Sequence, residues 1–297
     1  MHKKIVIIIC HLFFLDPLFP QTVSFDEQVQ KFADAVNPTL PFAANMGLNW
    51  STPYVGQLIG YPMHFGIGVF LGSAFMSNNE PAALGETMGI SIEESMIKGK
   101  QWFPNYVVAV RVGGFAGLPF DIGAKFGLVP DTALWGSLDY NSWIIGVDIH
   151  YALYVPKGNG PVIAVSLGYD RLEGGVTGTV TTVPGGTQDV TTDMPAHIVW
   201  ESNTVKAQAI ISQQLLATGL SFFGSIDLGF GMNKAGVKFG HNLDSPVYKN
   251  MKDVSTLLLS GSVGVGYEIG VFRIDASFMW NFINFESGIN FGIRYQR

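Results

Sequence analysis

The sequence predicts an all-β fold, a transmembrane antiparallel up-and-down β-barrel that follows a short N-terminal helix. Three observations predict it: segments in which apolar residues alternate with other residues, a low content of charged residues, and long connections that all fall on one side. In the segment from Ile145 to Leu153, the odd-numbered residues are all apolar. Such period-two alternation is typical of strands with one apolar face, and it recurs along most of the chain.

The composition fits a lipid-facing barrel. The chain has 297 residues, of which 13% are charged and 36 are glycine, whereas soluble domains carry about 25% charged residues and about 7% glycine. The formal net charge of -6 provides no basic stripe to neutralise phosphates, so we expect no nucleic-acid partner. Cys10 is the sole cysteine. If cleavage after this position removes it, the mature chain can form no disulfide and no thiolate metal site.

Residues 1–24 are predicted to form a signal peptide. Met1-His2-Lys3-Lys4 gives a charged start, and the apolar run from Ile5 to Leu15 is too short to span a bilayer as a helix. Small residues at Thr22 and Ser24 are consistent with cleavage before Phe25. We therefore expect export.

An amphipathic helix is predicted within residues 25–42. Phe25, Val29, Phe32 and Val36 recur at helical spacing, and Asn37-Pro38 interrupts the pattern. This helix precedes the barrel, so we expect it in the periplasm or as a plug in the barrel mouth.

The barrel is predicted to occupy residues 43–297. Alternation indicates twelve strands, at 62–76, 104–117, 120–130, 138–155, 162–173, 195–202, 205–216, 220–232, 235–241, 254–269, 271–281 and 286–296. Residues 43–61 alternate weakly and could add one hairpin. The predicted number of strands is therefore twelve or fourteen.

The predicted connections divide into two classes by length. If the last strand ends in the periplasm, the long connections at 77–103, 173–195 and 242–253 all lie outside the cell. Short turns at 117–119, 156–161 and 270 lie inside. Outer-membrane barrels show this asymmetry, and we predict a location in the bacterial outer membrane, among its lipids.

Charged residues gather on the face that the alternation assigns to the lumen. The candidates to line a constriction are Arg111, Asp121, Lys125, Asp148, His150, Asp170, Asp227, Glu268, Arg273, Asp275 and Arg294. A charged side chain that faces lipid at the midplane costs about 2 to 4 kcal/mol for Arg or Lys, which favours the lumen assignment. These residues form either a structural network of ion pairs or a constriction that solutes must pass.

No spacing of residues predicts catalysis, a metal site or a cofactor. His150 lies within a strand and His197 near a strand end, and neither has an acid or a serine at a spacing typical of a catalytic site. We therefore expect no enzyme, with outer-membrane hydrolysis as the third hypothesis.

Three resemblances extend this interpretation. The last strand, with Ile289, Phe291, Ile293 and Tyr295 alternating, resembles the terminal strand that the barrel-assembly machinery recognises, although Gln296-Arg297 follow the aromatic. From about Phe32 onward the chain resembles a family of uncharacterised outer-membrane barrels, through motifs at 37–40, 45–50, 66–70, 118–123 and 167–169. A helix followed by a barrel is also similar in architecture to outer-membrane long-chain fatty acid transporters.

The leading functional hypothesis is a passive channel or transporter for small solutes, including hydrophobic ones, with the helix gating the periplasmic mouth. The alternative is a closed-lumen structural barrel whose outer loops, at 77–103 and 173–195, bind partners.

Overall fold

The structure is a computed structural model that describes residues 24–47, 50, 52, 64–77, 79–88, 99–113, 118–135, 138–157, 160–180, 194–215, 218–240, 246 and 248–296. Its helices are α2 (Phe25–Val36), α3 (Thr39–Ala44) and α4 (Asn79–Thr87). Its strands are β1 (Phe65–Ser77), β2 (Lys100–Gly113), β3 (Phe120–Trp135), β4 (Leu138–Tyr154), β5 (Val162–Val180), β6 (Met194–Gln214), β7 (Leu220–Phe239), β8 (Tyr248–Ile269), β9 (Phe272–Asn281) and β10 (Glu286–Gln296). No helix in these ranges is long and apolar enough to cross a membrane.

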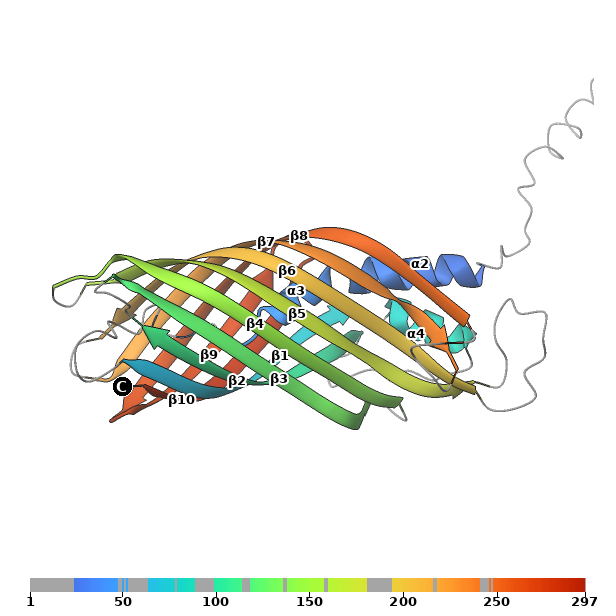
Figure 1. The fold of residues 1–297 in the computed structure, drawn as a ribbon, viewed down its shortest axis with the longest axis horizontal. Helices are drawn as coiled ribbons and strands as arrows, with labels where there is room; N and C mark the ends of the chain where they lie inside the picture. The colour runs from blue at the N-terminus through green and yellow to red at the C-terminus, as the bar shows by residue number, and fades with distance from the viewer. Residues whose placement is uncertain are drawn as a thin grey trace, which may run out of the picture.

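The strands form one closed antiparallel barrel (Figure 1). Each strand pairs with its neighbours in the chain, and β1 pairs with β10, for example at Ile67 and Tyr295, to close the sheet. This confirms the all-β antiparallel barrel and the short N-terminal helix. The predicted count of twelve or fourteen strands is wrong, because the closed sheet in the described ranges contains ten.

The count was wrong because two strands were each divided in two. The segments 195–202 and 205–216 belong to β6, and 220–232 and 235–241 correspond to β7. In both strands the apolar residues change faces at the division: Met232 points outward and is 56% exposed, whereas Val237 points inward and is fully buried. The change interrupts the alternation but not the strand. The described residues of the ambiguous stretch at 43–61 lie in no strand.

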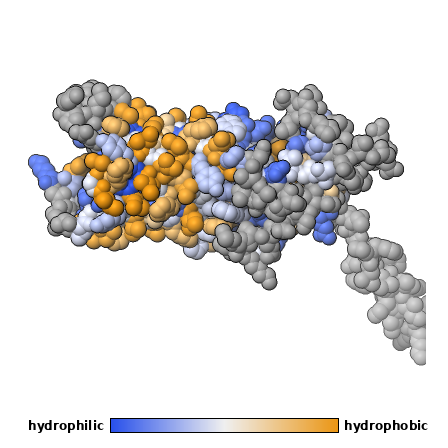
Figure 2. Space-filling view, turned by 90° about the horizontal axis from the view of Figure 1, so that it is seen from below, coloured by the Kyte–Doolittle hydropathy of each residue, from blue (hydrophilic) through white to orange (hydrophobic). Residues whose placement is uncertain are grey.

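A band of exposed apolar side chains covers one part of the outer wall, as the face drawn in Figure 2 shows, and such side chains occur on each of the ten strands. Val147, Ile226 and Val263 belong to it and are 50%, 62% and 65% exposed. Exposed apolar surface on this scale would be unfavourable in water, and a closed barrel satisfies its backbone hydrogen bonds without water. The band is therefore the surface that faces the hydrocarbon of a membrane.

The wall reverses its polarity beyond this band. On β7 the last outward-facing large apolar residue is Met232, and the strand continues for seven more residues. On β8 the first such residue is Leu257, and the strand begins nine residues before it. At about 3.4 Å per residue and the usual tilt of barrel strands, the projecting part is roughly 20 Å tall. Its buried face carries apolar side chains, among them Phe103, Tyr140 and Trp200, whose ring centroids lie 5.2 to 6.4 Å apart. We call this projecting part the outer extension.

The outer extension marks the end of the barrel that faces away from the cell. The connections β1–β2, β5–β6 and β7–β8 all lie at this end, as the strand directions require. They are the longest connections, and outer-membrane barrels place long connections outside and short turns in the periplasm. Because the predicted count was too high by an even number of strands, two or four, the predicted sides of these connections do not change.

Helix α2 lies inside the outer extension. Ser24 caps α2 by accepting a hydrogen bond from the backbone N–H of Glu27 at 3.2 Å. The apolar face of α2, which includes Phe32, is buried, and α2 contacts β7, β8 and α4. Asp26 accepts hydrogen bonds from Lys252 and Asn250, both at 2.9 Å. These bonds hold the pKa of the Asp26 carboxyl below its usual value.

The chain then passes down through the barrel. A break at Asn37-Pro38 separates α2 from α3, and α3 contacts β5, β6, β7, β8 and β1 (Figure 1). Thr52 reaches Arg273 and Arg294 near the opposite, periplasmic end, where β1 begins. The sequence predicted this helix either in the periplasm or in a mouth of the barrel. In the structure α2 occupies a mouth of the barrel, the outer one. Residues 1–23 lie outside the described ranges.

The polarity of the wall can be tested with one substitution inside the band and one beyond it. Val263→Arg on β8 places a cation toward lipid, so we expect it to lower the free energy of unfolding by about 2 to 4 kcal/mol. Ser255→Arg, on the same face of the same strand but at the edge of the band, should cost about 0 to 1 kcal/mol. Urea unfolding in liposomes would measure both, and equal costs would contradict the assignment of the band.

Candidate functional site

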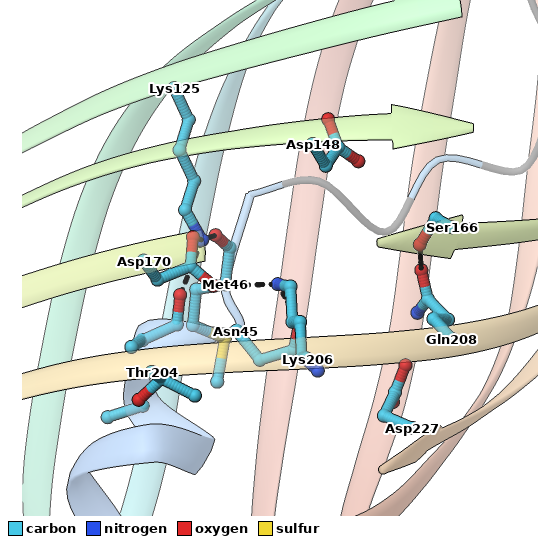
Figure 3. Close-up of polar contacts among 12 residues, drawn as sticks. Asn45, Met46, Lys125, Asp148, Ser166, Asp170, Thr204, Lys206, Gln208 and Asp227 are labelled. Atoms are coloured by element: carbon cyan, nitrogen blue, oxygen red, sulfur yellow. Dashed lines mark hydrogen bonds and ion pairs between the residues drawn. The ribbon is translucent and has the colours of Figure 1, made fainter. Parts of the chain in front are cut away.

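The lumen beside α3 contains two buried lysines that bind the N-terminal segment (Figure 3). Lys125 of β3 donates to the carbonyl oxygens of Ala44 and Met46, the latter at 2.8 Å. Lys206 of β6 donates to the side-chain oxygen of Asn45. We call residues 37–47, which these lysines hold, the plug.

One carboxylate binds both lysines. Asp170 of β5 lies 2.9 Å from the ammonium of Lys125 and 2.8 Å from that of Lys206, and all three side chains are almost fully buried. The C-terminal carbonyls of α3 carry the negative end of the helix dipole, which attracts the second positive charge. The plug therefore supplies the oxygen atoms that, together with Asp170, balance the charges of the two lysines.

Further hydrogen bonds fix the plug along its length. Asn233 of β7 donates to the carbonyl of Asn37 at 2.9 Å, and Asn105 of β2 donates to that of Ala43 at 3.4 Å. Thr39 donates to the buried carboxylate of Glu286. A Cβ at Gly72 of β1 would lie 2.7 Å from the sulfur of Met46, so glycine is needed there for the plug to lie against the wall.

A second group of charges lies closer to the periplasmic end. Arg111 of β2 is bonded to Asp121 of β3 at 2.6 Å and to Asp148 of β4 at 3.0 Å. His150 lies against both carboxylates. A Cβ at Gly123 would lie 2.1 Å from Asp148, so the absent side chain makes room for this network.

Trp50 joins this group to the charges of β9 and β10. Its ring contacts the guanidinium groups of both Arg111 and Arg294, at 5.2 and 4.6 Å from the ring centroid, in cation–π contacts. Arg294 also binds Asp275 at 3.3 Å and donates to Thr52 at 2.9 Å. The lumen here is filled by paired charges and one aromatic ring.

The remaining predicted lumen residues lie at the periplasmic mouth and in the lower wall. Arg273 pairs with Glu268 at 3.5 Å, and Glu268 is exposed at the mouth. Asp227 of β7 is fully buried and accepts hydrogen bonds from serine hydroxyls.

The structure thus places ten of the eleven predicted residues in the buried interior and Glu268 at its mouth. Sequence reasoning missed Lys206, Glu286 and Trp50. Lys206 has the lumen parity of its strand, between Val205 and Ala207, so parity alone could have found it. Nothing in the sequence near Trp50 indicates that it lies against two arginines.

A closed barrel of even strand number, with an outward apolar band and a charged interior, is the form of bacterial outer-membrane proteins. The chain is an outer-membrane β-barrel protein. Its sequence matches no protein-family model and no curated protein.

Several solved outer-membrane barrels show limited structural similarity to it. The outer membrane protease OmpT from Escherichia coli aligns with a TM-score of 0.45 and 9% identity, over 81% of this chain and 100% of that chain. The translocator domain of autotransporter NalP from Neisseria meningitidis aligns with a TM-score of 0.38 and 11% identity, over 80% and 89%. The attachment invasion locus protein Ail of Yersinia pestis aligns with a TM-score of 0.33 and 10% identity, over 79% and 99%. The fold assignment here rests on the strand topology, not on these similarities.

The lysine pair can be tested through its shared carboxylate. Asp170→Asn leaves two buried cations without their counter-charge, so we expect a loss of about 3 to 5 kcal/mol in the free energy of unfolding. Glu173→Gln, on the same strand but partly exposed, is the matched control and should cost less than about 1 kcal/mol. Urea unfolding in liposomes would measure both changes. A loss at Asp170 no larger than that at Glu173 would show that the lysines do not depend on Asp170.

Proposed function

We propose that this protein is a closed outer-membrane barrel whose outer extension binds a partner at the cell surface. The observation that carries the first part is the plug, which occupies the lumen and completes the hydrogen bonds of Lys125 and Lys206. The leading sequence hypothesis, a passive channel for small solutes, would require the plug and α2 to leave the lumen.

The cost of opening favours the closed barrel. Water would replace the hydrogen bonds of the plug at a net loss of about 0.5 to 1.5 kcal/mol each. Withdrawing α2 would also expose Val29, Phe32 and Val36, now fully buried, at about 1.5 to 3 kcal/mol per side chain. A total on the order of 10 kcal/mol leaves the lumen open in about one molecule in ten million.

The second part rests on the shape and charge of the outer extension. Glu173, Glu201, Lys234 and Asp253 lie directly opposite one another across β5, β6, β7 and β8, on the outward face above the apolar band. A recess of about 550 Å³ lies among Glu201, Lys234, Lys249, Met251 and Asp253. Glu173 and Glu201 are like charges directly opposite each other, which destabilises a sheet. Arg171 pairs with Glu173 and offsets part of this repulsion, and a binding role would account for the rest.

The partner that fits this surface is a protein. The row carries charges of both signs, with Lys234 between Glu201 and Asp253, which suits a partner that presents complementary charges of both signs and not a polyanion such as a nucleic acid. We propose no hydrolytic role, because His150 is buried between two aspartates. The similarity in architecture to fatty acid transporters stays a prediction.

Conductance tests the closed lumen. The folded protein in a planar bilayer should show no steady conductance, because the plug and α2 block the lumen on its outer side. A variant that lacks residues 25–47, checked for folding by heat-modifiable migration, should conduct and serves as the positive control. Steady conductance of the folded wild-type protein would contradict the proposal.

Charge reversal tests the binding surface. Lys234→Glu turns the row into a continuous acidic one, so we expect it to weaken attachment of expressing cells to a panel of immobilised proteins, by about tenfold if one ion pair with the partner is lost. Lys157→Glu reverses an exposed charge at the periplasmic end and is the matched control. If both variants attach as the wild type does, this row of charges is not the binding surface.

A further inference from the structure

A row of polar side chains crosses four strands of the lumen wall on the periplasmic side of the plug. Ser166 of β5, Gln208 of β6, Asp227 of β7 and Ser260 of β8 are directly opposite one another in the strand register. Figure 3 shows the first three with their side chains directed into the lumen. The plug lies above them, since Pro41 packs at Gly231, four residues farther along β7.

Asp227 differs from the other buried aspartates of the barrel. Asp121 and Asp148 bind Arg111, Asp170 binds two lysines, and Asp275 binds Arg294. In the described part of the chain, no Lys or Arg lies within ion-pair distance of Asp227. Lys206 acts on it only from a greater distance, because Asp170 and Asn45 hold its ammonium group.

The two oxygens of this carboxylate differ in their hydrogen bonding. Oδ2 accepts hydrogen bonds from Ser260 at 3.2 Å and from Ser225 at 3.4 Å. Oδ1 is buried and makes no hydrogen bond of normal geometry with the described residues, and the Gln208 side chain is the further polar group that interacts with the carboxylate. A carboxylate buried without a counter-charge is unfavourable by several kcal/mol, so it must either be protonated or bind a cation.

The neighbouring groups favour a bound cation. The hydroxyls of Ser225, Ser260 and Ser262 surround the carboxylate, and the Oγ atoms of Ser225 and Ser262 are 2.8 Å apart. Serine oxygens have lone pairs that can turn toward a cation. Oxygen ligands suit hard cations, and one carboxylate among neutral hydroxyls balances a single positive charge, whereas Ca²⁺ sites use several carboxylates. The described residues contain no cluster of three His, Cys, Asp or Glu that could hold a metal ion of higher charge.

We propose that Asp227, with the hydroxyls of Ser225, Ser260 and Ser262, binds one Na⁺ ion that enters from the periplasmic side. The polar side chains around the site, Ser166, Gln208, Ser212 and Ser262, are 5 to 7% exposed, whereas Asp227 and Ser260 are fully buried. Solvent therefore reaches the rim of the site from the half of the lumen that the plug does not fill. The site does not depend on the binding surface proposed above.

Na⁺ titration of the full-length protein in detergent micelles tests the site. When NaCl replaces choline chloride at constant ionic strength, the wild-type midpoint of thermal unfolding should rise by at least about 2 °C, because the ion binds the folded state only. Asp227→Asn should abolish the rise. Asp139→Asn, the same change at an exposed position of β4, should retain it. Ser260→Ala should shift the rise to higher Na⁺ concentration.

Infrared spectroscopy separates a cation site from a protonated acid without relying on the folding of a variant. In choline chloride the wild-type protein should show the C=O stretching band of a protonated carboxyl, and NaCl should remove it. Asp227→Asn should show no such change. A band that persists in NaCl, or a wild-type midpoint that is the same in both salts, would overturn the proposal and assign Asp227 as a neutral, protonated acid.

Discussion

The structure depends on one constraint: each part of the wall must turn its apolar side chains away from water. Within the membrane, water is excluded outside the barrel, so Val263 and Ile226 point outward and the charges point inward. Beyond the membrane, water surrounds the wall, and Val237 and Trp200 point inward instead. The same strands meet both conditions because alternate residues face opposite sides.

This reversal explains why the helices lie where they do. The inward apolar side chains of the outer extension need an apolar partner, and α2 supplies one with Val29, Phe32 and Val36. The inward charges of the membrane part need polar partners, and the plug supplies carbonyl oxygens to Lys125. One segment of chain thus passes from an apolar to a polar surrounding as it descends. Its structure changes accordingly, from an amphipathic helix to a short buried helix followed by carbonyls that accept hydrogen bonds from Lys125.

Most charged side chains of the lumen have an opposite charge directly beside them, but the numbers of positive and negative partners differ from one group to the next. Asp170 binds two lysines, Arg111 binds two aspartates, and Asp227 has no cation beside it. Buried ion pairs contribute little net stability over apolar packing, but removing one partner is costly. The network around Asp170 therefore fixes the position of the plug, and the network around Arg111 contacts Trp50, whereas the carboxylate of Asp227 lies in the lower wall without a counter-charge beside it.

The sequence by itself determined the barrel, the sides of its long connections and the face of each charged residue, because period-two alternation is a local property of each strand. It did not determine the strand number, since a change of apolar face at residues 203–204 and 233–234 resembles a turn when only neighbouring residues are compared. It also could not show that Lys206 and Trp50 contact residues far away in the chain. Those contacts depend on how the closed sheet and the N-terminal segment share one interior, which is decided only when the tertiary structure brings them together.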